Sequence, residues 1–197
     1  MEYSPQTFNI PALDGISQKS IDEHLDLYQG YVKNFNAISA NLLGYAKDTE
    51  TNAHALAELI RRRSFEFGGM RLHELYFSQF EGGAAPLNPE SAFAKQMDTE
   101  YHKLEYFLGM FKAIGLMRGP GWALLYWDPI GKQFLTGFSG EQHQGHFATL
   151  PVLLALDVWE HAFLIDYGAQ GKAKYVDAFF KNLNWETVEK RFALVRA

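Results

Sequence analysis

The stretch LALDVWEHAFLIDYG, residues 154–168, places several polar side chains in a run that otherwise resembles a buried core segment. Asp157 and His161 are four residues apart, so on a helix they share one face, and at the end of a strand they can also converge on one point. One interpretation is a metal site. The other is a helix start at which Asp157 caps the first turn and His161 is half buried. From the residues of this segment alone, both interpretations stay open.

The composition narrows the class of protein. The chain has 197 residues, 47% of them hydrophobic and 15% aromatic, which suits one compact unit or two small domains with a shared core. The net charge of −5 does not favour a nucleic acid or an anionic membrane as partner. There is no apolar run of about 20 residues and no signal-peptide pattern, so we expect a cytoplasmic protein. Because cysteine is absent, a metal must be bound by His, Asp, Glu or backbone atoms.

Helical periodicity dominates the first part of the chain. Residues 17–46 lack proline and place apolar side chains three or four positions apart, which predicts one long helix. Residues 52–67 continue helically into GGMRLHELYFSQF, residues 68–80, where Gly68-Gly69 predicts a point of close approach. Together these segments predict a helical hairpin.

A boundary rich in glycine and proline, EGGAAPLNPES at residues 81–91, follows this hairpin. We therefore predict an N-terminal helical hairpin domain, residues 1–83, and a C-terminal domain, residues 88–197. In the second domain we expect one helix at 92–116, strands near 123–127, 132–138 and 150–156, and closing helices at 175–183 and 185–196. The predicted fold class is α+β: an N-terminal α-helical hairpin followed by a C-terminal α/β domain with a small three-stranded antiparallel sheet.

Four titratable side chains fall on or beside apolar stripes, namely His24, His73, Asp157 and His161. Three imidazoles and one carboxylate would make a donor set that suits Fe or Mn better than a softer metal. Other histidines, such as His54, lie among polar helix neighbours and are expected at the surface.

Five segments, in order along nearly the whole chain, resemble the iron/manganese superoxide dismutase family. DVWEHAF, at 157–163, is similar to the family signature DVWEHAY, in which the Asp and the last His are metal ligands. GPGW, at 119–122, is similar to its GSGW element, and YVDAFFKNLNW, at 175–185, to its closing segment. GGMRLHELYF, at 68–77, resembles its second ligand helix, and YVKNFN, at 31–36, the segment after its first ligand.

The resemblance implies an oxidoreductase with antioxidant function, a superoxide dismutase that converts superoxide to O₂ and H₂O₂ at one Fe or Mn ion per subunit. It also implies a homodimer with no nucleic-acid or membrane partner. Two alternatives stay open because the chain departs from the family pattern at several positions: a mononuclear metal oxidase or oxygenase on the same His/Asp site, and a non-catalytic metal-binding relative. His73, Asp157 and His161 match family ligand positions directly.

The first ligand position is shifted. The family has a His eight residues before the Tyr of its Tyr-Val pair, and in this chain that position holds Glu23, with His24 seven residues before Tyr31. Seven residues are nearly two helical turns, so His24 and Tyr31 share a face. This favours His24 as the ligand, with Glu23 as the rival.

The resemblance also implies residues around the metal. The gateway tyrosine of the family corresponds to Tyr31, with Tyr28 as a competing candidate. The family places a hydrogen-bonding residue on the metal-bound solvent, and in the loop of residues 140–151 His143 is the favoured match, with Gln142 and Gln144 beside it. A chain from the solvent through His143 to Tyr31 would then be the proton path.

Further residues are implied in the pocket wall, at the subunit interface and along the substrate path. Trp122 matches the tryptophan that walls the metal pocket. Glu160 corresponds to the family residue that bonds the partner chain's ligand His, whereas Leu164 replaces an aromatic residue that helps to bridge the dimer. Lys33 and Lys172 are the candidates for steering anionic superoxide.

Overall fold

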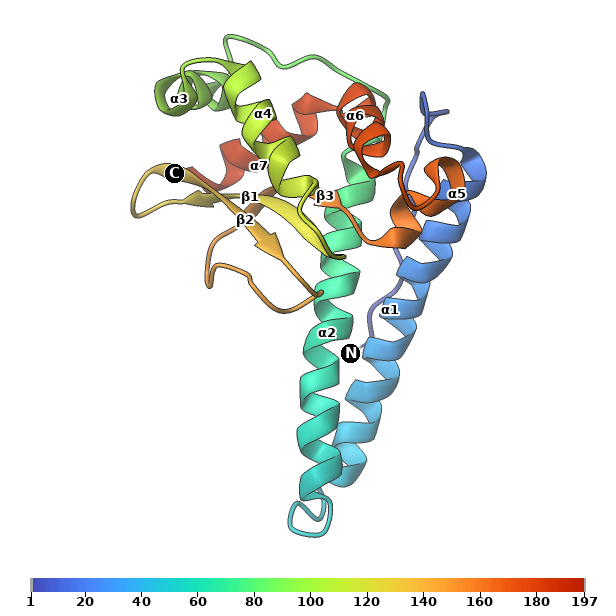
Figure 1. The fold of residues 1–197 in the computed structure, drawn as a ribbon. Helices are drawn as coiled ribbons and strands as arrows, with labels where there is room; N and C mark the ends of the chain where they lie inside the picture. Colours follow the sequence, from blue (N-terminus) through green and yellow to red (C-terminus); the bar gives the residue numbers. More distant parts are fainter. Residues whose placement is uncertain (1, 197) are drawn as a thin grey trace.

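A computed structural model describes residues 2–196, with two long helices that pack side by side and project from a region of shorter helices and sheet (Figure 1). The long helices are α1 (Gln18–Tyr45) and α2 (Ala53–Ser78). At the start of α1 the Ser17 side chain accepts a hydrogen bond from the Ser20 backbone N–H, which satisfies one of the free amides of the first turn. The hairpin predicted from the sequence is therefore present.

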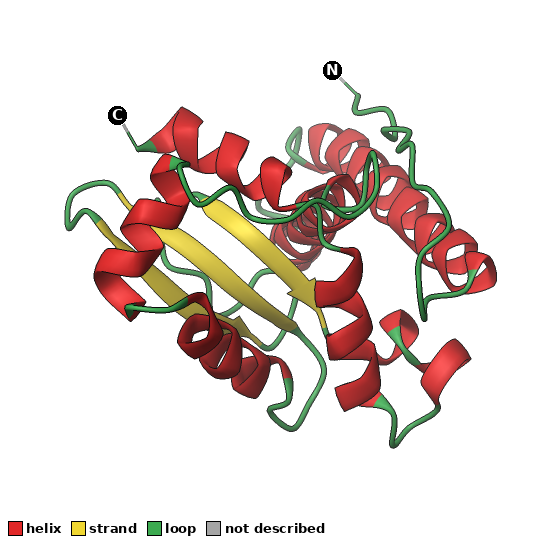
Figure 2. Ribbon diagram, turned by 90° about the horizontal axis from the view of Figure 1, so that it is seen from above, coloured by secondary structure: helices red, strands yellow, loops and turns green. Residues whose placement is uncertain are grey.

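The second half of the chain contains the sheet. Its strands are β1 (Trp122–Asp128), β2 (Gln133–Ser139) and β3 (Val152–Asp157), antiparallel and in the order β2-β1-β3, so that β1 is central (Figure 2). The helical elements are α3 (Ala92–Tyr101), α4 (Leu104–Gly115), the 3₁₀ helix η1 (Glu160–Ala162), α5 (Leu164–Tyr167), α6 (Lys172–Asn182) and α7 (Trp185–Val195). The predicted α+β class with a three-stranded antiparallel sheet is confirmed. No helix of the described residues is long and apolar enough to cross a membrane.

One predicted element is wrong. The single helix expected at 92–116 is divided into α3 and α4. His102 adopts a left-handed backbone conformation, with φ of 63°, and Lys103 is extended, so the helix path is interrupted between them. Neither glycine nor proline marks this break, and therefore no sequence signal announced it.

Polar side chains fix the sheet to the end of the hairpin. The Gln79 amide, just after α2, donates to the backbone carbonyl of Ala155 and accepts from its N–H, both at 2.8 Å. The Arg191 guanidinium of α7 donates to backbone carbonyls of both α2 and β3. As a result, the strand that ends in Asp157 is held at a fixed position against the helix that carries His73. The division at residues 83–88 into two domains stays a prediction.

Candidate metal centre

Four side chains from four elements meet beside the end of the sheet: His24 of α1, His73 of α2, Asp157 at the end of β3 and His161 of η1. One donor atom from each of them lies within 4.8 Å of the other three. The Nε2 atoms of His161 and His24 lie 3.1 and 3.2 Å from Asp157 Oδ2, and that of His73 lies 3.6 Å away. All four candidate ligands that the sequence indicated are therefore brought together.

The geometry distinguishes His24 from its neighbour Glu23. His24 is 2% exposed and its ring lies 4.7 Å from that of His161, measured between centroids. The Glu23 side chain is exposed, and its carboxylate lies 3.7 Å from Lys19 Nζ. Only His24 of these two residues belongs to the cluster.

His73 shows that the cluster suits a metal. Its Nδ1 lies 2.6 Å from the Gly69 carbonyl oxygen, so Nδ1 carries the proton and donates it there. Its buried Nε2 has no hydrogen-bond partner among the described residues, although an isolated buried polar atom is costly. Burial lowers the pKa of His73 to about 3, so the ring is neutral and its free lone pair faces the other ligands. With this nitrogen, the cluster offers three nitrogen donors and one oxygen donor, a set that fits Fe or Mn.

Asp157 completes the electrostatics of the cluster. Burial alone would raise the pKa of this carboxyl, but the interactions with His161 and His24 outweigh that effect and hold it well below its usual range. Its second oxygen, Oδ1, accepts a hydrogen bond of 2.8 Å from the Trp159 N–H. The carboxylate is therefore ionised and fixed in orientation, as a metal ligand has to be.

A hydrogen-bonded chain lies next to the cluster. Gln142 is fully buried, and its Nε2 donates to the Tyr31 hydroxyl at 3.0 Å. The Trp122 Nε1 donates to Gln142 Oε1 at 2.8 Å, which fixes the orientation of the amide. Trp122 is itself fully buried, with its ring 5.1 Å from that of His73. The tryptophan thus walls the site and also positions Gln142.

His143, which the sequence favoured in this hydrogen-bonded chain, makes no hydrogen bond to Tyr31 among the described residues. His143 packs edge-on against Phe65, with ring centroids 5.6 Å apart, and its Nδ1 lies 3.5 Å from a Glu141 carboxylate oxygen. The hydrogen bond to Tyr31 comes from Gln142 instead, and Gln144 is exposed. The direction of each side chain is set largely by contacts with other elements, namely Tyr31 and Trp122 for Gln142 and Phe65 for His143. Three consecutive polar residues in the sequence do not reveal these contacts.

Two glycines of α2 allow the loop that carries Gln142 and the helix α1 to lie close to α2. A Cβ on Gly68 would lie 1.9 Å from the Gln142 carbonyl oxygen, and one on Gly69 would lie 2.4 Å from the Tyr31 ring. Any larger residue would clash at either position. The close approach predicted for this pair of glycines is confirmed.

An open pocket of about 770 Å³ leads to Tyr31 and His161. Tyr28 does not line it, since its hydroxyl accepts from the Gln6 N–H and donates to Glu74 on another side of α1. The residues that line the pocket come from α1, α2, η1 and α5, and are Glu23, Asp26, Leu27, Gly30, Tyr31, Asn34, Arg62, Phe65, Glu66, His161, Leu164 and Ile165. Of the two tyrosines, Tyr31 is therefore the one that lines the pocket, and its role as the gateway residue stays a prediction.

Neither lysine that the sequence singled out lines this pocket. Lys33 is exposed and lines a separate depression with Tyr3 and Asn36. The Lys172 ammonium donates to the backbone carbonyls of Met117 and Gly119, so it fixes a loop. Glu160 is exposed next to His161, and its proposed contact with a second subunit stays a prediction.

A charged pair at the pocket, Arg62 and Glu66, was not predicted from the sequence. Arg62 Nε donates to Glu66 Oε1 at 2.7 Å, and Glu66 is 1% exposed. Opposite charges four residues apart were visible in the sequence, but such pairs occur on the surface of many helices. The burial of Glu66 depends on how α1 and α2 pack and was not visible.

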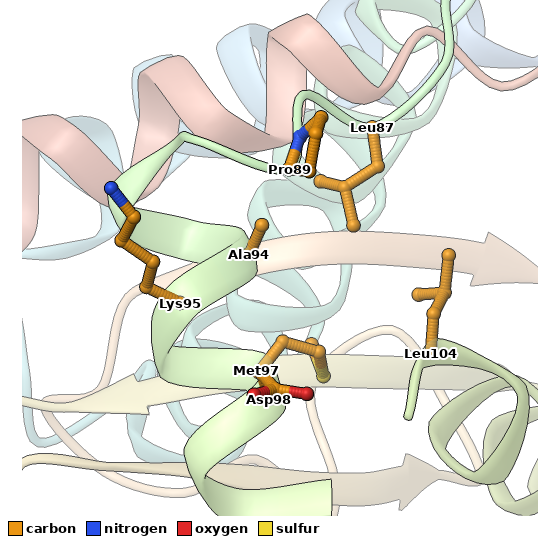
Figure 3. A pocket seen from close by; sticks show the side chains of 7 residues that line it. All are labelled: Leu87, Pro89, Ala94, Lys95, Met97, Asp98 and Leu104. Carbon is orange, nitrogen blue, oxygen red and sulfur yellow. The ribbon is translucent and has the colours of Figure 1, made fainter. Parts of the chain in front are cut away.

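Another depression lies between α3, the start of α4 and the loop before α3 (Figure 3). It is lined by Leu87, Pro89, Ala94, Lys95, Met97, Asp98 and Leu104. It contains no histidine and a single carboxylate, so it offers no second set of metal ligands.

Comparisons with known proteins place these features in a family context. Residues 89–191 match the family model described as iron/manganese superoxide dismutases, C-terminal domain. An iron superoxide dismutase of Saccharolobus solfataricus is 30% identical over 195 residues, which are 96% of this chain and 92% of that protein. An iron superoxide dismutase of Cupriavidus metallidurans is 33% identical over 92% of this chain and 90% of its own length. A manganese superoxide dismutase of Haloferax volcanii is 31% identical over 97% and 94%.

Proposed function

Since the chain belongs to the iron/manganese superoxide dismutase family, we propose that it converts two superoxide anions and two protons to O₂ and H₂O₂ at one Fe or Mn ion. The ion is bound by His24, His73, Asp157 and His161. The observation that carries this function is that the four donor atoms all lie within 4.8 Å of one another in a largely buried cluster. Superoxide is the substrate.

When bound, Fe or Mn would supply the redox chemistry, because both metals have stable +3 and +2 states. The protein's contribution is the ligand set, the hydrogen bonds around it and the exclusion of water. The three imidazoles are neutral ligands and the carboxylate carries one negative charge, so the set offsets one positive charge of the ion. Phe77 and Trp122 keep the surroundings apolar, and both are fully buried.

Tyr31 and Gln142 are the residues that handle protons in this proposal. Burial raises the pKa of Tyr31 to about 12, so its hydroxyl stays protonated at neutral pH. The hydroxyl oxygen accepts from the Gln142 amide, which leaves the hydroxyl proton free to be donated toward the pocket. In this proposal the Gln142 amide, rather than His143, would hydrogen-bond to solvent at the metal, because Gln142 is the residue that bonds to Tyr31.

The assembly in this proposal is a homodimer. Glu160 is exposed beside His161, and three apolar side chains at the pocket mouth, Leu27, Leu164 and Ile165, are 44%, 42% and 38% exposed. Apolar side chains gathered at one place on a surface favour contact with another protein surface. A second subunit would cover them and bring its Glu160 to the partner site.

The deciding experiment combines elemental analysis with activity. Protein expressed in Fe- and in Mn-supplemented medium is expected to contain about one ion per chain, and at least one form is expected to consume superoxide. Protein that binds no metal in either medium would support a non-catalytic relative. Bound metal without superoxide consumption would favour an oxidase or oxygenase, and both results contradict the proposal.

A further inference from the structure

We propose that Arg62 attracts superoxide into the pocket and that Glu66 determines how much of the arginine's charge the anion experiences. The inference rests on the proposed function, because it concerns the entry of that substrate. It assigns to these two residues the role that the sequence gave to Lys33 and Lys172.

The pocket is lined by more acidic than basic side chains. Apart from the ligand His161, Arg62 is the only basic side chain among the described residues that line it. Three carboxylates, those of Glu23, Asp26 and Glu66, line the same pocket. An anion that enters this pocket meets a field that is unfavourable unless the guanidinium offsets it. A single arginine therefore has a large effect on entry.

The Arg62 guanidinium is held in place by two contacts. Its Nε donates to Glu66, and its central carbon lies 4.2 Å from the centroid of the Phe65 ring. Glu66 is buried while the Arg62 side chain is 45% exposed and lines the pocket, and no other hydrogen bond of the guanidinium is found among the described residues. An arginine fixed in this way loses little conformational entropy when it meets an anion.

Glu66 determines how much of the charge of Arg62 acts on an anion in the pocket. Its carboxylate lies within hydrogen-bond distance of Arg62 and so offsets part of its positive charge. If Glu66 is replaced by Gln, the amide oxygen can still accept the hydrogen bond, but the charge of Arg62 is no longer offset. Neutralising Arg62 and neutralising Glu66 should therefore have opposite effects on the entry of the anion.

The test measures kcat/KM for superoxide as a function of ionic strength with the metal-loaded wild-type protein and its variants. Arg62→Leu is expected to lower kcat/KM by about threefold at low ionic strength, as one unit charge about 7 Å from an anion in water would. Glu66→Gln is expected to raise kcat/KM by a similar factor. Both differences shrink above about 0.15 M salt because the charges are screened. Arg62→Lys should retain most of the wild-type rate.

A second measurement does not depend on turnover. Azide, a small monoanion, is titrated against the metal-loaded proteins and followed by the visible spectrum. Its dissociation constant should rise about threefold in Arg62→Leu and fall in Glu66→Gln. Metal content, measured in parallel, should stay at the wild-type level in every variant.

The matched control is Arg61→Leu. Arg61 lies on the same helix, carries the same charge and pairs with Glu58 at 2.7 Å, but it does not line the pocket. The inference is overturned if Arg62→Leu leaves rate and azide affinity unchanged, or if Arg61→Leu lowers them equally. A wild-type protein that binds metal without consuming superoxide would instead overturn the proposed function, so the two failures are distinguishable.

Discussion

At the scale of single residues, one carboxylate organises the site. Asp157 Oδ2 faces the Nε2 atoms of three histidines, and Oδ1 accepts from the backbone. The carboxylate is fully buried. Such a group is tolerated only where positive charge compensates it. A bound cation would therefore stabilise the folded chain as well as supply the chemistry.

Replacing this carboxylate by an amide tests the ligand set. Asp157→Asn keeps the shape of the side chain but removes the negative charge, so we expect bound metal to fall at least about tenfold and activity to disappear. The thermal midpoint of the metal-supplemented wild type should exceed that of its metal-stripped form, whereas the variant should show no such difference. Full metal content and activity in Asp157→Asn would contradict the assignment.

Replacing Gln142 and His143 one at a time distinguishes their roles. Gln142→Leu removes the donor to Tyr31 and leaves the Trp122 N–H without its acceptor, so activity should fall at least about tenfold while metal is retained. His143→Gln should change the rate by less than about twofold, because His143 makes no hydrogen bond to Tyr31 among the described contacts. The two rates are compared at equal metal content. A larger loss in His143→Gln than in Gln142→Leu would restore the interpretation made from the sequence.

At the scale of elements, the site depends on how closely α2 approaches its neighbours. Gly68 lies against the backbone of the loop that carries Gln142, and Gly69 lies against the Tyr31 ring. Helix propensity alone would favour alanine at both positions. The glycines are needed because of what packs on the helix.

Gly68→Ala is therefore expected to destabilise the protein, against the helix propensity scale. The added methyl group overlaps the Gln142 carbonyl, so unfolding free energy should fall by about 2 kcal/mol or more and activity should fall with it. Gly109→Ala in α4 is the matched control, since a Cβ there meets nothing within 4 Å and should add up to about 1 kcal/mol. Chemical denaturation of both variants measures the difference. A Gly68→Ala protein as stable as Gly109→Ala would contradict the packing described.

At the scale of the whole molecule, the mouth of the pocket carries the apolar surface that a second subunit would cover. Leu164 and Ile165 follow directly after η1, which carries His161. An interface there would therefore be continuous with the site. In the proposed dimer, substrate access and assembly depend on the same surface.

Leu164→Asp tests the dimer. A carboxylate in an apolar interface should weaken association by more than about tenfold, and the protein should shift toward monomer in sedimentation or light scattering. Leu194→Asp is the control, because Leu194 is 82% exposed at the end of α7, outside the pocket. A wild-type monomer, or a dimer that Leu164→Asp leaves intact, would contradict the predicted interface.

The sequence by itself determined the parts of this protein that are encoded locally. The spacing of apolar residues in 17–46 and 52–80 defines the two long helices, and the composition of 81–91 marks the turn to the second half. The four candidate ligands were identified from residue types and from motifs that resemble a known family. Within residues 157–161, the spacing of Asp157 and His161 left a metal site and a helix start both open, and the resemblance to the family motif favoured the metal site.

Tertiary structure alone decided which of several adjacent side chains faces the site. The packing of α1 buries His24, in agreement with the helical spacing that favoured it over Glu23. Gln142 was distinguished from His143 by its hydrogen bonds to Tyr31 of α1 and Trp122 of β1. The charged pair at the pocket, Arg62 and Glu66, became visible only once α1 and α2 lay together. Neighbouring residues differ in direction and burial more than in chemistry, and those two properties are set by contacts between segments far apart in the chain.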